Sequence, residues 1–179
     1  LSRLSLFAAA AAAIFFFTNI TALTAPCAAQ ESKKLTILYT NDTHSRLIPF
    51  DRPDVGKSVG GIERRAEFFR SVKKREPGVL TVDAGDLSQG TPFYNFFKGE
   101  AEFNSFVLAG YDLAAVGNHE FDNGLANLKF QAEKSGLRFV CANLFDSGTL
   151  KPLFAPFKIV EIGGVKTAVI GIMGKESWS

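Results

Sequence analysis

The stretch LTILYTNDTH, residues 35–44, joins a strand-like run to a polar end that carries Asp42 and His44. Its first six residues are apolar, aromatic or β-branched, which is typical of a strand. Two later runs, Val79–Val82 and Leu113–Val116, have the same character, and polar loops follow both. A strand that ends in a polar loop therefore occurs three times, and this repeat decides the fold.

Helical patterns lie between and after these strands, at Ile62–Lys74, at Phe93–Ala109 with a break near Gly99, and at Leu125–Lys134. Phe139–Ala142 is a fourth expected strand, and Gly163-Gly164 is typical of the turn of a β-hairpin. The stretch Asn41–Val59 is expected to be a polar loop. Strands that alternate with helices predict the α/β class with a largely parallel sheet. Sites in such sheets form outside the carboxyl ends of the strands, so the loops there are the candidates.

The composition is that of an ordinary globular protein of about one domain. The 179 residues are 46% hydrophobic and 21% charged, with a formal net charge of +2. No long basic run occurs, so no nucleic-acid partner is expected. The aromatic segment Phe93–Phe97 is expected to pack in the core. Cys141 follows an apolar run and is expected to be a small buried thiol.

Residues 1–29 differ from the rest and predict a cleaved signal peptide. Arg3 is their only charge, Leu4–Ile20 is almost wholly apolar or alanine, and small residues lead to a cleavage site expected after Ala29. A membrane anchor is the alternative, but the apolar run is shorter than the roughly 20 residues that a spanning helix needs. We therefore expect a secreted or periplasmic protein with no stable membrane span after cleavage.

The three loops carry the donor atoms of a metal centre. Asp42 and His44 stand in the first loop, Asp86 in the second, and Asn118 and His119 in the third. The chain has two histidines, and both stand in these loops. A single polar loop can serve solubility alone, whereas three in register favour a shared site. Carboxylate, amide and imidazole donors suit divalent ions such as Mn²⁺, Zn²⁺, Mg²⁺ or Ca²⁺, and a structural zinc site would normally use cysteines.

The motif order Asp42-x-His44, Gly85-Asp86 and Gly117-Asn118-His119-Glu120 resembles that of the calcineurin-like metallophosphoesterases. The surrounding words, such as DAGDLSQGTP and GNHEFDNG, resemble the 5′-nucleotidase / UDP-sugar hydrolase / 2′,3′-cyclic phosphodiesterase family. The resemblance spans residues 35 to about 174. It implies an αββα sandwich, of which residues 30–179 would be the N-terminal part of the catalytic domain, without the C-terminal substrate-binding domain.

The resemblance also implies a centre of two divalent metal ions (Mn, Zn, Mg, Ca or Co). Asp42 and His44 would bind the first ion, Asp86 would bridge both ions, and Asn118 would bind the second. The family uses two further histidines and a glutamine late in its catalytic domain, and no histidine follows His119 in this chain. The chain alone is therefore expected to bind metal weakly and to be inactive.

The resemblance implies a catalytic role for His119, which would not be a ligand. Asn118 and His119 would contact the substrate, and His119 would stabilise or protonate the leaving-group side of the phosphate, oriented by Asp122. The implied nucleophile is a metal-bound hydroxide. Glu120 and Asn123 are expected to be polar neighbours and not ligands.

The implied activity is hydrolysis of phosphate esters of nucleotides, of the 5′-nucleotidase type. The metal loops bind phosphate and not the base, so a 2′,3′-cyclic nucleotide phosphodiesterase or a UDP-sugar hydrolase stays open. A third alternative is a non-catalytic metal-binding protein. The expected partner is a small nucleotide, and the oligomeric state is left open.

Overall fold

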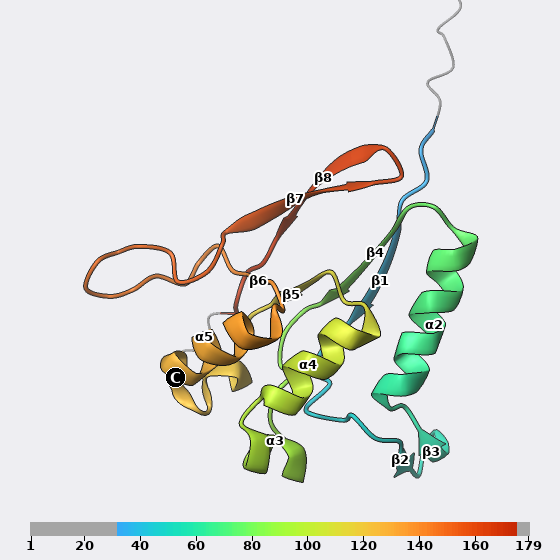
Figure 1. Ribbon diagram of the computed structural model, residues 1–179, viewed down its shortest axis with the longest axis horizontal. Helices are drawn as coiled ribbons and strands as arrows, with labels where there is room; N and C mark the ends of the chain where they lie inside the picture. Colours follow the sequence, from blue (N-terminus) through green and yellow to red (C-terminus); the bar gives the residue numbers. More distant parts are fainter. Residues whose placement is uncertain (1–31, 175–179) are drawn as a thin grey trace, which may run out of the picture. The chain divides into compact units, whose positions relative to one another are not determined.

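The computed structural model describes residues 32–174, and the predicted signal peptide, residues 1–29, lies outside them (Figure 1). Four strands form a parallel sheet in the order β1-β4-β5-β6. Their bounds are Thr36–Thr40, Val79–Asp83, Leu113–Ala115 and Phe139–Val140. The predicted α/β class and parallel sheet are confirmed. Thr40 pairs with Asp83 and Asp83 with Ala114, so the carboxyl ends of β1, β4 and β5 lie level.

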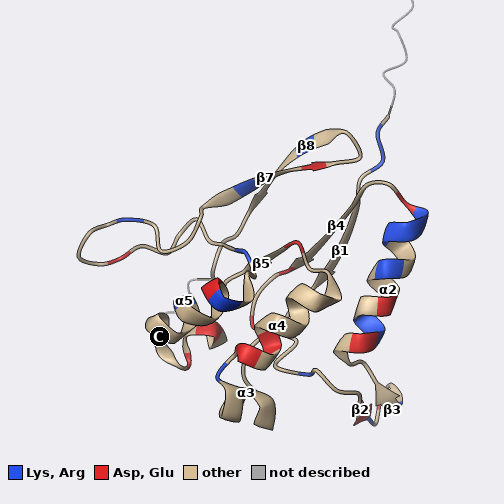
Figure 2. Ribbon diagram, in the orientation of Figure 1, with Lys and Arg blue, Asp and Glu red and all other residues tan. Residues whose placement is uncertain are grey.

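The helices also occupy the predicted segments. They are α2 (Ile62–Arg75), α3 (Pro92–Phe97), α4 (Glu100–Ala109) and α5 (Gly124–Ser135). The expected break near Gly99 is present, because Lys98 and Gly99 adopt left-handed backbone with φ of 51° and 97° between α3 and α4. Figure 2 shows that α2 contains both basic and acidic residues along its length, which is typical of a helix with one solvated face.

The core lies between the helices and the parallel sheet. Helix α4 packs on both α2 and α5 (Figure 1). Phe103 and Phe106 of α4 are 2% and 0% exposed, and they share one cluster with Phe69 of α2 and Leu128 of α5. Burying these large side chains holds the helices against the strands and so fixes the positions of the strand ends.

A short hairpin interrupts the stretch Asn41–Val59, so the prediction of a loop there is wrong. Strand β2 (Phe50–Arg52) pairs antiparallel with β3 (Gly56–Val59), with Phe50 opposite Val59. Both strands are short and mostly exposed. They therefore lack the alternation of apolar and polar residues by which a sequence reveals a strand.

The second hairpin is confirmed. Strand β7 (Phe157–Ile162) pairs antiparallel with β8 (Val165–Ile170) over six residue pairs. Gly163 and Gly164 form its turn, with φ of 56° and 73°, and positive φ at both central positions is what a type I′ turn requires. The chain on either side of the hairpin attaches to the end of β6, because the N–H of Cys141 donates to the carbonyl of Ala155 at 2.9 Å and the N–H of Ala142 donates to the carbonyl of Gly171 at 2.8 Å.

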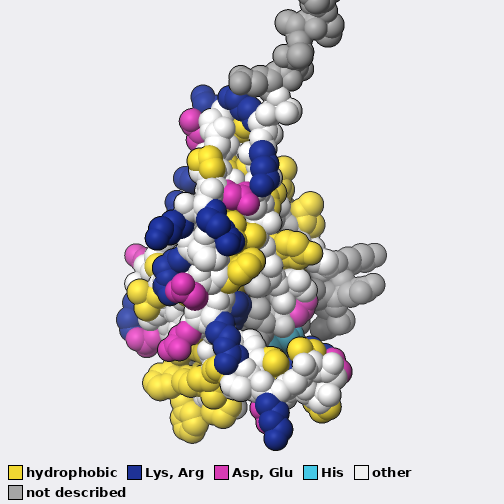
Figure 3. All heavy atoms as spheres, turned by 90° about the vertical axis from the view of Figure 1, so that its right-hand side faces the viewer, with side chains coloured by type: hydrophobic (Ala, Val, Ile, Leu, Met, Phe, Trp, Pro, Cys, Tyr) yellow, Lys and Arg dark blue, Asp and Glu magenta, His cyan; other side chains and the backbone are white. Residues whose placement is uncertain are grey.

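The aromatic segment on α3 differs from its prediction. Tyr94 is buried, but Phe96 and Phe97 are 80% and 52% exposed, so core packing is wrong for these two rings. Helix α3 has only six residues and can turn only one side toward the core. Figure 3 shows hydrophobic side chains gathered in the lower part of the view, the level at which α3 and β2 lie in Figure 1.

Two further expectations concern burial and membrane spans. Cys141 is 0% exposed, which confirms the prediction of a buried thiol. Within residues 32–174, no helix combines the length and the apolar character needed to cross a bilayer.

Candidate metal centre

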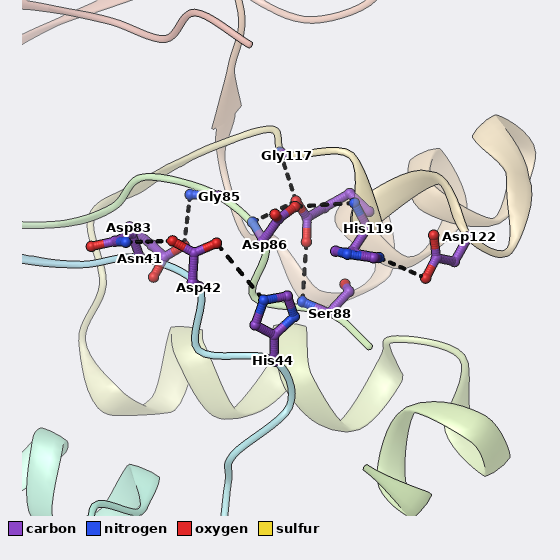
Figure 4. Close-up of polar contacts among 11 residues, drawn as sticks. Asn41, Asp42, His44, Asp83, Gly85, Asp86, Ser88, Gly117, His119 and Asp122 are labelled. Carbon is purple, nitrogen blue, oxygen red and sulfur yellow. Dashed lines mark hydrogen bonds and ion pairs between the residues drawn. The ribbon is translucent and has the colours of Figure 1, made fainter. Parts of the chain in front are cut away.

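Asp42, His44 and Asp86 lie together at the carboxyl ends of β1 and β4 (Figure 4). One ligand atom of each residue lies within 4.8 Å of the others. The carboxylate Oδ1 of Asp42 is 3.7 Å from Nε2 of His44. Asp42 is exposed and the other two are half-buried, so the group faces solvent on one side. Two carboxylates and an imidazole at this separation can hold a divalent ion.

The backbone at these three residues is held in an unusual conformation. Asp42, His44 and Asp86 have φ of 51°, 42° and 54°, in the left-handed region that residues other than glycine seldom adopt. The N–H of Asp42 donates to the carbonyl of Gly85, and the N–H of His44 donates to the carbonyl of Asp86, both at 3.0 Å. Each loop thus holds the other in place, and such maintained strain is characteristic of functional sites.

Asn118 lines the same cavity as Asp42 and Asp86. This cavity of about 140 Å³ lies between the loops after β1, β4 and β5, with Gly85 and Gly117 in its wall. Asn118 is half-buried. Asn118 thus lines a cavity beside two of the three clustered residues. The two carboxylates and the imidazole fit a divalent ion.

The close approach of the second and third loops requires glycine. A Cβ atom on Gly117 would lie 2.1 Å from Oδ1 of Asp86, and one on Gly85 would lie 2.9 Å from the backbone nitrogen of Gly117. The backbone N–H of His119 donates to Oδ1 of Asp86 at 3.0 Å. Glycine at these two positions therefore brings Asp86 beside Asn118 and His119.

His119 and Asp122 form a hydrogen-bonded pair beside this group. They lie at the two ends of a short 3₁₀ segment, with Nδ1 of His119 3.0 Å from Oδ2 of Asp122 (Figure 4). The rings of His44 and His119 lie edge to face, with centroids 5.2 Å apart. Asp122 thus contacts Nδ1, and the opposite ring nitrogen, Nε2, is not part of this pair.

Two buried carboxylates lie beside this group: Glu120, which the sequence analysis expected to be a polar neighbour and not a ligand, and Asp83, which it did not single out. Glu120 is 1% exposed and accepts hydrogen bonds from three backbone N–H groups. Burial raises the pKa of its carboxyl, and the three donors oppose that rise. The signal in the sequence was the position of Glu120 between the ligand loop and Asp122, but a position does not reveal which way a side chain points.

Asp83 is the second buried carboxylate, 2% exposed at the end of β4. It accepts hydrogen bonds from the hydroxyl of Thr40 at 2.5 Å and from the N–H of Gly85 at 2.9 Å. Burial raises the pKa of Asp83 to about 7, although both hydrogen bonds act in the opposite direction.

Comparison with known proteins defines the class. Residues 35–171 match the model of the calcineurin-like phosphoesterases, and this chain belongs to that family. The chain is 39% identical over 156 residues to the snake venom 5′-nucleotidase of Gloydius brevicauda, across 82% of this chain and 26% of that protein. It is 35% identical over 187 residues to the 5′-nucleotidase of Rattus norvegicus, across 95% of this chain and 31% of the relative.

The solved structures agree with this assignment. The crystal structure of a 5′-nucleotidase precursor from Thermus thermophilus superposes with a TM-score of 0.71 at 36% identity, across 80% of this chain and 29% of that one. The predicted metallophosphoesterase fold and the resemblance to 5′-nucleotidases are confirmed. The chain spans about a quarter to a third of the length of these relatives.

Proposed function

We propose that this chain is the N-terminal part of the catalytic domain of a 5′-nucleotidase-type hydrolase, which cleaves phosphate esters of nucleotides with two divalent metal ions. The observation that carries the proposal is the meeting of Asp42, His44 and Asp86 within 4.8 Å at the ends of two parallel strands. The similarity to 5′-nucleotidases over 82% of the chain supports the substrate class.

The proposed roles are those that the family resemblance implies, and the clustering of Asp42, His44 and Asp86 supports them. Asp42 and His44 would hold one ion, Asp86 would bridge to a second, and Asn118 would bind that second ion and a phosphate oxygen. When bound, the two ions would supply Lewis-acid polarisation of the phosphoryl group and of the attacking water.

His119 would act on the leaving group. Its Nδ1 lies 3.0 Å from Oδ2 of Asp122, so the Nδ1–H would donate to that carboxylate, and Nε2 would carry a second proton to donate when the ring is in its imidazolium form. A proton donated from Nε2 would go to the ester oxygen as its bond to phosphorus breaks, which prevents the release of an unstable alkoxide. Asp122 contributes by fixing the tautomer and by stabilising the protonated imidazole.

The experiment that tests the activity uses the complete gene product. We expect phosphate release from AMP that requires Mn²⁺, Zn²⁺, Mg²⁺, Ca²⁺ or Co²⁺ and stops after chelation. A parallel panel of UDP-glucose and 2′,3′-cyclic AMP separates the two alternative hydrolases. Absence of metal-dependent hydrolysis of every substrate in the panel, in a protein that is folded, would refute the proposal.

A second candidate applies to the 179-residue chain by itself. Within residues 32–174, the second ion has only Asp86 and Asn118 as proposed protein ligands. We therefore propose that the isolated chain is a metal-binding but inactive fragment, which is tested by measuring Mn²⁺ binding and AMP hydrolysis on the same sample.

Export to the periplasm or to the cell exterior is proposed from residues 1–29.

A further inference from the structure

Glu120 follows directly on two proposed site residues, yet its side chain lies in the interior. Its exposed fraction is 1%, whereas the side chain of His119 is 29% exposed. A carboxylate at such a depth is stable only where donors surround it. Those donors come from two of the three loops that carry the proposed ligands.

Three backbone N–H groups meet the carboxylate of Glu120. Oε2 accepts from Asp86 at 3.0 Å and from Gly117 at 2.7 Å, and Oε1 accepts from Ser88 at 3.1 Å. Asp86 and Ser88 belong to the loop after β4, whereas Gly117 belongs to the loop after β5. One side chain therefore joins the backbones of both loops, and hydrogen bonds to a charged acceptor are about twice as strong as neutral ones.

A second hydrogen bond joins the same two loops in the opposite direction. Oδ1 of Asp86 accepts the N–H of His119 at 3.0 Å, so the third loop also holds the side chain of the second. Asp86 has φ of 54°, a conformation that needs support from its surroundings, and its N–H donates to Glu120. Without Glu120, the Asp86 loop would be free to relax toward an ordinary backbone conformation.

We propose that Glu120 is a positioning residue that sets the separation of the two proposed metal sites. It acts through the backbone of Asp86 and Gly117, and thereby places the carboxylate of Asp86 opposite Asn118. The inference rests on the proposed metal centre, and it assigns to Glu120 no contact with a metal ion or a substrate.

The test compares Glu120→Gln with Asp112→Asn in the full chain. Glutamine keeps the size of the side chain but turns an NH₂ donor toward backbone N–H groups that need an acceptor. Asp112 is the matched control, because it stands before the amino end of β5 and accepts the N–H of Thr81 at 2.8 Å and a hydrogen bond from Lys73 at 3.2 Å. It thus also joins neighbouring segments of the sheet, at the end away from the ligand loops.

The first readout is Mn²⁺ binding by calorimetry. We expect Glu120→Gln to weaken binding about 10–100-fold, the usual effect of losing a residue that orients a ligand. Asp112→Asn is expected to lower stability and to leave Mn²⁺ affinity unchanged. The second readout is the amide NMR signals of Asp86, Ser88 and Gly117, which should shift in Glu120→Gln while the signals of α2 stay in place.

Each other outcome is decisive. Wild-type Mn²⁺ affinity in a folded Glu120→Gln variant would overturn the inference, and so would an equal loss in Asp112→Asn. Glu120→Asp serves as the second variant, since its shorter carboxylate cannot reach all three donors. Failure of both variants to fold, seen by circular dichroism, would show a role in the whole fold and would also overturn it. Absence of Mn²⁺ binding by the wild-type chain would instead refute the proposed metal centre.

Discussion

The carboxyl ends of β1, β4 and β5 and the loops after them contain two kinds of carboxylate. Asp42 and Asp86 line a cavity and have one side open to solvent, whereas Asp83 and Glu120 are 2% and 1% exposed. The chain places the two kinds in the same short segments, with Asp83 only three residues before Asp86. All four are carboxylates close to the same strand ends, and their burial separates the two kinds.

The difference lies in what each carboxylate has for a partner. Asp42 and Asp86 line the cavity and offer ligand atoms within 4.8 Å of each other and of His44, although Oδ1 of Asp86 also accepts the N–H of His119. Asp83 and Glu120 accept hydrogen bonds from backbone N–H and hydroxyl groups of the surrounding loops. Acids of the first kind would carry out chemistry, and acids of the second kind hold the backbone on which that chemistry depends.

Replacing Asp86 with Asn should have the largest effect on activity, and it tests the role proposed for the carboxylates that are open to solvent. Asn removes one charge and one oxygen from the proposed bridge between two ions. The proposed ions stabilise the transition state by several kcal/mol, and losing that stabilisation should lower kcat of the complete enzyme roughly 10⁴-fold or more. Steady-state hydrolysis of AMP measures this loss. The metal-free melting temperature should stay near that of the wild type, and full activity in this variant would contradict the assignment.

Replacing His119 with Ala should have the second-largest effect. The proposed proton donor is lost while the ligands remain, so kcat should fall about 10²–10⁴-fold. Mn²⁺ affinity, measured by calorimetry, should change little, which distinguishes His119 from Asp86. A matched Asp122→Asn variant should lose less activity, since it disturbs only the tautomer and charge of His119. Equal losses of Mn²⁺ affinity in His119→Ala and His44→Ala would refute the distinction.

The sequence predicted the parallel sheet because each strand is a compact apolar run that ends in a polar loop. It also predicted the helix break at Gly99 and the turn at Gly163-Gly164, because glycine marks those backbone conformations locally. The hairpin of β2 and β3 escaped prediction because its residues are exposed and carry no alternation. Phe96 and Phe97 were assigned to the core because hydrophobicity alone does not show which side of a short helix faces inward.

The site, like the fold, contains features that could be predicted from the sequence and features that could not. The gathering of Asp42, His44 and Asp86 could be expected, since the ends of adjacent parallel strands meet at one edge. The burial of Asp83 and Glu120 could not be expected from the sequence. Asp83 ends a strand and Glu120 follows one, and at both positions only the contacts with neighbouring segments reveal that the acid is enclosed.

Replacing Asp83 with Asn tests the buried carboxylates, and its effect should appear in the pH dependence of stability and least in catalysis. Burial raises the pKa of Asp83 to about 7 in the folded state, whereas its ordinary value is 3.8. The folded state therefore keeps a proton that the unfolded state loses near pH 4. The stability that this proton provides is fully present below about pH 4 and is lost as the pH rises toward 7.

The measurement is the free energy of unfolding by urea, with metal chelated, for the wild type and Asp83→Asn between pH 4 and pH 8. The wild type should lose stability relative to the variant across this range, by on the order of 4 kcal/mol at most, and the difference should level off above pH 7. Contributions from the open carboxylates Asp42 and Asp86 are present in both proteins and largely cancel. If the difference in free energy of unfolding between the wild type and Asp83→Asn does not change with pH, Asp83 is already charged in the folded state at pH 4. Burial would then not have raised its pKa, and the distinction from Asp86 would fail.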